Sequence, residues 1–539
     1  MGLRRNTGGN SSKDKPVDIK AIQEKLLAKK KAKYSINIPM SIKRSGLIEI
    51  RREYNLLRVP PLDMEVTSLV IRLLSFRKQI FDNVSQGMRF ETVDCYATID
   101  IAGCTCIICG AGIEEELVYV LETVGYEVLV SDVIRQSQER LARSQLDKDI
   151  FVRALGQPRD WQLKAFDAMV NHRCGQLCTA TGAGKTTLIA STIRALPRAR
   201  ILYTVRGKQA LNGAFASTVR YVPDAYLVKS EKILRDVRVV FCSVGMLETV
   251  IQQRLTFDWV FVDEQHETCT EYQMNRLLPV RCYKIFALSA EYRARNDNAD
   301  RWSDVAYGPL RLMRSYQENM EAGDVTPVEV RWRSCSKLPK ISTGTATDTN
   351  IRAVWNNEDR NRLIINDAMR HVQQQVLITV QTVEHGLLLK QLLPHATLAC
   401  GTIADERKDE FLRRELLSPY DLEITEDDLN NMRVMFARRQ IMLAIATSVW
   451  WKAVDFPQLE VILRADAISS DTIINQITGR GSRISGRKSK VIVYDYLDEF
   501  NPSLKRRASK RARFYTNAGF KQTQFADSYS NQQANDGKR

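Results

Sequence analysis

The chain has 539 residues, of which 44% are hydrophobic and 26% charged, so it is long enough for about three globular domains. It has no run of eighteen apolar residues and no apolar signal-peptide core. Its eleven cysteines do not show the regular spacing of a disulfide framework. These features predict a soluble, cytoplasmic protein. The net charge of +16 lies almost wholly in two tails, because residues 1–34 and 501–539 each carry +7. Basic tails raise affinity for a phosphate backbone, although they can also serve only solubility.

Residues 1–33 read as a basic flexible tail that turns into a lysine-rich helical stretch. Residues 34–150 follow an α+β pattern, with strand-like runs such as YSINI and ETVDCYATIDIAGCTCIICG before an amphipathic helix. Gly125 is expected to end that helix, and EVLVSDVI reads as a last strand. We expect a small accessory domain that binds nucleic acid.

Three cysteines of the accessory region, Cys104, Cys106 and Cys109, lie close together in the sequence. Their spacing suggests a zinc site, with Cys95 nearby. No second closely spaced pair completes such a site, and the apolar surroundings favour buried free thiols. The sequence leaves the choice open.

Apolar strands alternate with helical segments over residues 151–325, and again over residues 326–500. This rhythm predicts buried parallel sheets with crossover helices. We therefore expect an α/β protein: two tandem doubly wound parallel-sheet domains, with the accessory domain before them. The acidic segment 417–430 reads as a loop or short insertion in the second domain, and residues 501–539 read as a basic helix and tail.

The segment TATGAGKT at 179–186 follows a predicted strand and opens a helix, with Thr179 where the full phosphate-loop pattern has glycine. Its glycines let backbone N–H groups curl around phosphate oxygens at a helix N-terminus. Lys185 would reach the β- and γ-phosphates of ATP, and the Thr186 hydroxyl would bind Mg²⁺. The candidate nucleotide-binding residues of the loop are Thr181, Gly182, Ala183, Gly184, Lys185, Thr186 and Thr187.

The apolar strand DWVFV ends in Asp263 and Glu264, followed by Gln265 and His266. Asp263 would hold Mg²⁺ through water, and Glu264 would orient and deprotonate the attacking water. Gln265 and His266 would face the γ-phosphate and the partner domain.

Upstream of the phosphate loop, the amide of Gln162 could read the adenine edge, with Trp161 or Arg159 beside the ring. The alternative is that these residues only cap a helix.

The segment QITGRGSR at 476–483 holds two arginines three residues apart, Arg480 and Arg483, so both point to the same side of a helical turn. Across a cleft from the phosphate loop they would stabilise charge on the γ-phosphate, as arginine fingers do. Gln476 begins this segment and is a further catalytic candidate. Asp455, in the VDFP loop, is a candidate nucleotide contact.

The phosphate loop, DEQH, the LSAEYR segment, AIAT with VDFP, and Q-x-x-G-R-G-x-R occur in the order of superfamily 2 helicase motifs I, II, III, V and VI. The set spans residues 158–500, and the chain resembles superfamily 2 DNA helicases, most of all UvsW-type and XPB-type members. That resemblance implies RecA-like domains that use ATP and Mg²⁺. It also implies that His266, Ser289 and Ala290 couple ATP to nucleic acid.

The chain departs from the usual motifs at three places. Motif III ends in Glu291 where many relatives have Thr, Ala453 replaces a glycine, and the pair Trp450 and Trp451 is unusual. The tryptophans are either a stacking element or part of the core.

Strand ends on the cleft side are the expected nucleic-acid track, because ligands bind outside the carboxyl ends of parallel strands. Small polar groups there would grip phosphates without reading bases. The candidates are Arg206, Lys208, Ser243, Gln381, Thr382 and Thr447.

The resemblance implies an ATP-dependent DNA helicase or translocase that remodels duplex or branched DNA by branch migration and by fork or D-loop unwinding. Such enzymes act in recombination, repair and replication, with DNA and recombination or single-strand-binding proteins as partners and no membrane. One alternative is a DEAD-box RNA helicase, against which DEQH and SAE count. Another is an annealing or scaffold protein with a vestigial ATPase fold, against which the intact Lys185, Glu264, Arg480 and Arg483 count. A third is a restriction motor, against which the lack of a recognisable nuclease domain in this sequence counts.

Overall fold

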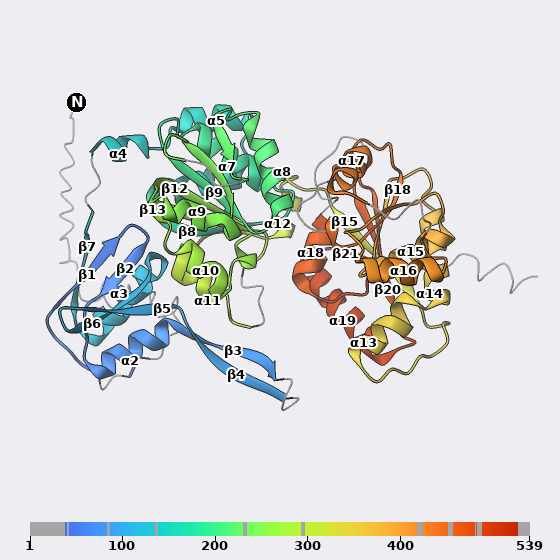
Figure 1. Ribbon diagram of the computed structural model, residues 1–539, viewed down its shortest axis with the longest axis horizontal. Coiled ribbons are helices and arrows are strands. Elements are labelled where there is room, and N and C mark those ends of the chain that lie inside the picture. Colours follow the sequence, from blue (N-terminus) through green and yellow to red (C-terminus); the bar gives the residue numbers. More distant parts are fainter. Residues whose placement is uncertain are drawn as a thin grey trace, which may run out of the picture.

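The structure is a computed structural model, and Figure 1 shows an N-terminal unit, a first α/β domain and a second α/β domain. It describes residues 38–39, 42–82, 87–134, 138–229, 234–292, 297–417, 424–450, 456–479, 481 and 488–525. The basic tail at 1–33 lies outside the described residues.

The N-terminal unit has a five-stranded mixed sheet in the order β5-β6-β2-β1-β7, with two helices that contribute to its core. Gly125 caps the second helix in the left-handed conformation, at φ 113°, which confirms the predicted helix end. The elements of this unit are β1 (Leu47–Glu53), β2 (Leu56–Val59), α2 (Met64–Leu73), β5 (Tyr96–Ile101), β6 (Cys104–Gly110), α3 (Glu114–Val124) and β7 (Glu127–Asp132).

Two further strands of this unit, β3 (Ser75–Asp82) and β4 (Gly87–Asp94), pair only with each other. They form an antiparallel ribbon that projects from the unit in Figure 1.

The N-terminal unit is fitted tightly against the first α/β domain. A Cβ added to Gly112 would lie 2.3 Å from the backbone nitrogen of Gly308, so only glycine allows this approach. Arg301 of the α/β domain donates a hydrogen bond to the carbonyl of Leu73 and pairs with Glu116 at 2.7 Å. Because one hydrophobic cluster runs through both regions, we infer that they move as one body.

The first α/β domain has a seven-stranded parallel sheet in the order β10-β11-β9-β12-β13-β8-β14. Its inner strands are largely buried and apolar, as a sheet covered on both faces requires, whereas the edge strands β10 and β14 are partly exposed. Its elements are α5 (Lys148–Leu155), α6 (Asp160–Asn171), β8 (Cys174–Thr179), α7 (Lys185–Arg194), β9 (Ile201–Val205), α8 (Lys208–Val219), β10 (Ala225–Leu227), β11 (Val239–Ser243), α9 (Leu247–Gln252), β12 (Thr256–Asp263), α10 (Glu271–Leu277), β13 (Arg281–Ser289), α11 (Arg301–Tyr307), β14 (Leu310–Arg314) and α12 (Tyr316–Glu321).

The second α/β domain repeats this plan, with seven parallel strands in the order β17-β18-β16-β19-β20-β15-β21. The two sheets confirm the predicted pair of doubly wound parallel-sheet domains behind an accessory unit. Its elements are β15 (Val328–Ser334), α13 (Ala346–Asp348), α14 (Glu358–Met369), β16 (Val376–Thr379), α15 (Val383–Leu392), β17 (Thr397–Ala399), α16 (Asp405–Arg413), α17 (Glu426–Ala437), β18 (Leu443–Ala446), β19 (Val461–Arg464), α18 (Asp471–Gly479), β20 (Val491–Leu497), α19 (Pro502–Asn517) and β21 (Lys521–Phe525).

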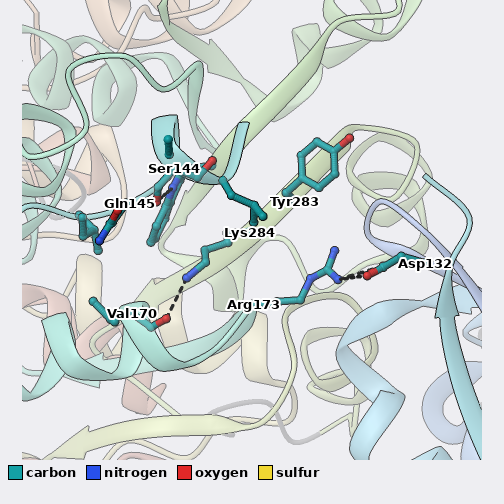
Figure 2. A pocket seen from close by; sticks show the side chains of 11 residues that line it. Asp132, Ser144, Gln145, Val170, Arg173, Tyr283 and Lys284 are labelled. Carbon is teal, nitrogen blue, oxygen red and sulfur yellow. Dashed lines mark hydrogen bonds and ion pairs between the residues drawn. The ribbon is translucent and has the colours of Figure 1, made fainter. Parts of the chain in front are cut away.

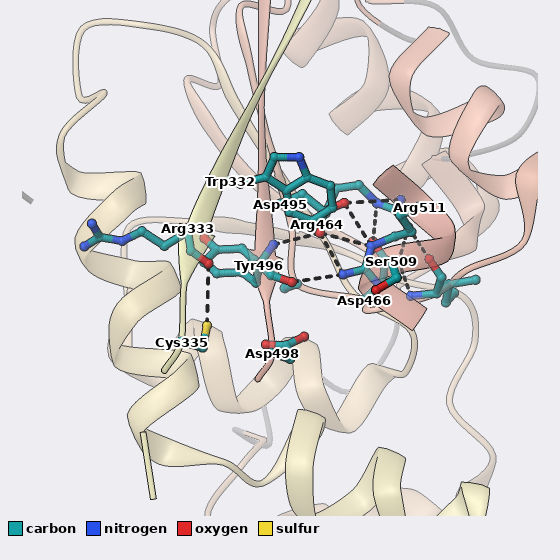
Figure 3. Close-up of polar contacts among 12 residues, drawn as sticks. Trp332, Arg333, Cys335, Arg464, Asp466, Asp495, Tyr496, Asp498, Ser509 and Arg511 are labelled. Atoms are coloured by element: carbon teal, nitrogen blue, oxygen red, sulfur yellow. Dashed lines mark hydrogen bonds and ion pairs between the residues drawn. The ribbon is translucent and has the colours of Figure 1, made fainter. Parts of the chain in front are cut away.

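The C-terminal helix and strand belong to this second domain, although the sequence suggested a helix and tail beyond it. Strand β21 pairs with β15, and α19 is held by a fully buried charge cluster, shown in Figure 3. Arg511 of α19 donates to Asp495 at 2.9 Å, and Arg464 donates to Asp466 at 2.5 Å. The guanidinium of Arg511 is therefore paired inside the domain and unavailable to a phosphate backbone.

None of the helices in the described ranges is both long and apolar enough to span a membrane.

Candidate nucleotide-binding site and nucleic-acid interface

The phosphate loop joins the carboxyl end of β8 to the N-terminus of α7. Gly182 and Gly184 have φ angles of 83° and 98°, which non-glycine residues rarely adopt. The ammonium group of Lys185 is buried and lies 3.3 Å from the carbonyl oxygen of Thr179. The loop is thus curled around a space at the helix N-terminus, as phosphate binding requires.

Two carboxylates stand at the end of β12, and their surroundings differ. Asp263 is buried and accepts hydrogen bonds from the Tyr203 hydroxyl at 2.7 Å and from the Glu264 backbone at 3.0 Å. Burial and the nearby Glu264 charge raise the pKa of Asp263 to about 6. Glu264 is one-third exposed and has a φ of 48°, so a non-glycine residue holds a left-handed conformation here.

A buried hydrogen-bonded pair links the DEQH segment to motif III. The Nδ1 atom of His266 lies 2.9 Å from the Ser289 hydroxyl, which accepts a hydrogen bond from the Glu291 backbone at 3.0 Å. The two bonds of this hydroxyl are complementary when it donates to His266. The Nε2 atom of His266 is buried and has no hydrogen-bond partner within the described ranges, so it is available to a ligand.

The residues upstream of the phosphate loop pack against it. The amide oxygen of Gln162 accepts from the Arg159 backbone at 3.0 Å, and the Arg159 guanidinium donates to the carbonyl of Ala183. Arg159 also pairs with Asp324 at 3.2 Å. Trp161 is buried in the domain core, so only Arg159 of the two suggested residues can lie beside a base.

The second domain meets the phosphate loop directly. A Cβ added to Gly479, at the end of α18, would lie 2.7 Å from the Cβ of Thr181. Helix α18 also carries Gln476. Arg480, Arg483 and Asp455 lie outside the described residues, so their places in the site stay predictions.

A cavity of about 550 Å³ lies at this junction and is lined by the phosphate loop, Asp263, Glu264 and residues of α8 and α17. The donor set fits a nucleoside triphosphate with Mg²⁺: backbone N–H groups and Lys185 suit phosphates, and the oxygens of Thr186 and Asp263 suit the metal.

A larger cavity, about 910 Å³, lies at the opposite, amino end of the strands (Figure 2). Arg173 and Asp132 are paired beside it at 3.0 Å, and Lys284 donates to the Val170 carbonyl at 3.1 Å. Burial lowers the pKa of Lys284 to about 8. The phosphate loop and the two carboxylates of β12 do not line this cavity, so it is separate from the nucleotide cavity.

The candidate nucleic-acid residues of the second domain lie together. Gln381, Thr382 and Thr447 line one hollow of about 340 Å³, at the carboxyl ends of β16 and β18. Thr382 caps α15 there, and its hydroxyl accepts from the His385 backbone at 3.3 Å. Arg407 lines the same hollow, paired with Glu384 at 3.4 Å. Sequence reasoning missed Arg407, because nothing local ties it to the strand ends.

The candidates of the first domain follow β9 and β11, which are neighbouring strands. Arg206 donates to the carbonyl of Glu267 at 3.3 Å, and Ser243 ends β11. Lys208 pairs with Glu426 of the second domain at 3.2 Å. Lys208 is therefore a contact between domains in this structure, and its role in nucleic-acid binding stays a prediction.

The structure also describes Trp450 and the cysteines that suggested a zinc site. Trp450 is buried and packs against Phe436 with ring centroids 5.2 Å apart, so it is a core residue. Cys106 and Cys109 are buried and Cys104 is exposed. Within the described ranges no group of three or more His, Cys, Asp or Glu side chains is placed to hold a metal ion.

Residues 155–293, which hold the phosphate loop and the DEQH strand end, match the sequence family described as "Type III restriction enzyme, res subunit". None of the curated proteins matches the chain. Solved structures similar to the chain include a putative HsdR subunit of a type I restriction enzyme from Vibrio vulnificus YJ016, which is 14% identical over 82% of this chain and 79% of that chain, with a TM-score of 0.47. T4 UvsW is 16% identical over 88% of this chain and 98% of that chain, with a TM-score of 0.38. S. cerevisiae Dbp5, bound to RNA and ADP BeF3, is 13% identical over 72% of this chain and 97% of that chain, with a TM-score of 0.48.

Proposed function

We propose that this chain is a superfamily 2 helicase, a nucleic-acid-stimulated ATPase that translocates on DNA and remodels duplex or branched substrates. One observation carries the proposal: Gly479 of the second domain lies against Thr181 of the phosphate loop. A nucleotide held by the loop would therefore lie between two domains. Binding and hydrolysis would then change how the domains sit relative to each other, which is how such a motor steps.

Hydrolysis would take place at the end of β12. Lys185 would hold the β- and γ-phosphates, and Glu264, which is partly exposed, would take the proton of the attacking water. Mg²⁺, held by Thr186 and Asp263, would offset phosphate charge when bound. His266 would contact the γ-phosphate, and its 2.9 Å hydrogen bond to Ser289 would couple this contact to motif III. Arg480 and Arg483, which belong to the second domain, would stabilise the negative charge that develops on the γ-phosphate.

The nucleic-acid strand would cross the carboxyl ends of both sheets, over Arg206 and Ser243 and then over Gln381, Thr382 and Thr447. The hollow beside Thr382 supports this path, because a helix N-terminus and small hydroxyls favour phosphate oxygens. The accessory domain, proposed at 34–150, and the basic tail at 1–33 would hold the duplex. Branch migration and fork or D-loop unwinding, in recombination, repair and replication, are the activities we propose.

The test is ATP hydrolysis by the full chain with single-stranded, duplex, forked and four-way DNA and with RNA, each at matched nucleotide concentration. We expect stimulation by DNA, largest with forked or four-way substrates. Equal or stronger stimulation by RNA would favour an RNA helicase. Absence of ATP turnover with every substrate would leave the vestigial-ATPase alternative.

A further inference from the structure

Helix α17 is fixed to the second domain through one of its faces. Phe436 is fully buried and packs against Trp450 and Phe456, with ring centroids 5.2 Å and 4.7 Å apart. Thr425 caps the N-terminus of the helix, and its hydroxyl accepts a hydrogen bond from the Asp428 backbone at 3.1 Å. Because its anchor lies in the domain core, α17 must move with the second domain.

An adjacent side of α17 faces the first domain and its nucleotide cavity. Arg433, Val434 and Ala437 line the same cavity as Lys185, Asp263 and Glu264. Positions 426, 430, 433 and 437 fall on one side of an α-helix, and Glu426 at the start of that side pairs with Lys208 of α8 at 3.2 Å. That pair is about two-thirds exposed on each side, so it is weak enough to break when the domains separate.

The guanidinium of Arg433 has no hydrogen bond or ion pair with the described part of the chain. Other arginines of this domain are paired, for example Arg439 with Glu460 at 2.7 Å. Of the cavity's other cations, Arg159 is paired with Asp324, whereas Lys185 donates to a loop carbonyl and lies within electrostatic range of Asp263. A triphosphate brought into the cavity would therefore meet one cation from each domain: Lys185, which lies near the Asp263 carboxylate, and Arg433, which is paired with no carboxylate of the described residues.

We propose that Arg433 binds the terminal phosphate of the nucleoside triphosphate across the domain boundary. The proposal rests on the ATPase function proposed above. A planar guanidinium on a rigid helix suits a phosphate because it offers several donors at once. Arg433 would distinguish a triphosphate from a diphosphate, and loss of the terminal phosphate would release α17 from α8.

The test compares full-length wild-type protein with Arg433→Ala and Arg433→Lys. Arg438→Ala is the matched control, because Arg438 is exposed at the end of the same helix and does not line the cavity. Affinities for AMP-PNP and for ADP are measured by calorimetry, and thermal unfolding shows that each variant is folded. We expect Arg433→Ala to weaken AMP-PNP binding about tenfold, as for a lost charge-assisted hydrogen bond, and to leave ADP binding unchanged. Arg433→Lys should lose less, and Arg438→Ala should lose nothing.

Equal losses for AMP-PNP and ADP, or no loss for either, would overturn the assignment of Arg433 to the terminal phosphate. The wild-type arm separates this result from a failure of the proposed function. If wild-type protein binds AMP-PNP and hydrolyses ATP while Arg433→Ala behaves like wild type, only the role of Arg433 falls. If wild-type protein binds no nucleotide, the ATPase function falls and the role of Arg433 falls with it.

Discussion

Gly479 and Thr181 come from different domains, yet a side-chain carbon on Gly479 would lie 2.7 Å from the Cβ of Thr181 and 2.8 Å from its Cγ2. The end of helix α18 thus meets the phosphate loop at a point where only a hydrogen atom fits. Arg480, which we propose acts on the γ-phosphate, is the next residue in the sequence.

Gly479→Val should keep the domains from closing on the nucleotide. We expect turnover to fall on the order of 10²-fold through misplacement of the second domain, while ATP affinity stays close to wild type. The control is Gly401→Ala in the same domain, whose added Cβ would meet only Val449 at an ordinary 3.7 Å. Steady-state ATPase with saturating DNA and equilibrium nucleotide binding check both. Wild-type turnover in Gly479→Val would show that the contact is not needed for catalysis.

Lys185 and Glu264 should fail in different ways. Lys185→Ala should weaken nucleotide binding and abolish turnover, because a buried cation of the loop is lost. Glu264→Gln should still bind ATP but hydrolyse it roughly 10²- to 10⁴-fold more slowly, because only the base is removed. Glu248→Gln, at an exposed position of α9, serves as the control. Near-normal turnover by Glu264→Gln in a single-turnover assay would remove Glu264 as the base.

The motif VI arginines should act on turnover and not on ground-state binding. Arg480→Ala or Arg483→Ala should lower turnover by about 10³-fold or more if either is a true finger. Arg513→Ala, exposed on α19, is the control. ATPase rates and AMP-PNP affinities, measured on the same variants, show whether each arginine acts on turnover or on nucleotide binding. A variant that loses affinity and keeps its maximal rate would place that arginine in binding alone.

The N-terminal tail should add affinity for DNA without specificity. Residues 1–33 carry a net +7, whereas residues 526–539 carry no net charge, so deleting the latter is a matched control. Each phosphate that the tail neutralises adds about 0.9 to the slope of log K against log salt for duplex DNA. Deleting 1–33 should flatten that slope and leave maximal ATPase nearly unchanged. A salt titration of DNA affinity, with duplex and four-way DNA of matched length, measures this slope. An unchanged slope would mean that the tail serves only solubility.

The buried arginine of α19 should matter for stability far more than its exposed neighbours. Arg511→Ala leaves Asp495 buried without its 2.9 Å partner, which costs about 3–5 kcal/mol for a broken buried pair. Lys510→Ala, exposed on the same helix, should cost almost nothing. Urea unfolding followed by circular dichroism compares the two variants. Equal stability of both would show that the cluster does not hold the C-terminal helix in place.

The amino-acid sequence determined the features whose geometry is local. Glycines at 182 and 184 and the strand–helix pattern around them predict a phosphate loop, because only glycine readily adopts the φ angles that the loop needs. The buried strand before Asp263 places both carboxylates at a sheet end, and the alternation of strands and helices predicts two parallel sheets. Both sheets are confirmed, since such runs can be buried only inside a covered sheet.

Only the tertiary structure decided which distant residues meet. The bond from Tyr203 to Asp263 joins neighbouring strands that lie 60 residues apart. Arg433 reaches the nucleotide cavity because α17, which begins within the segment 417–430 expected as a loop or short insertion, lies against the first domain. Arg511, which reads as part of a basic surface helix, is instead neutralised in the core by Asp495. Composition and periodicity say how a segment folds, but a charge's partner depends on the packing of whole elements, which no local pattern encodes.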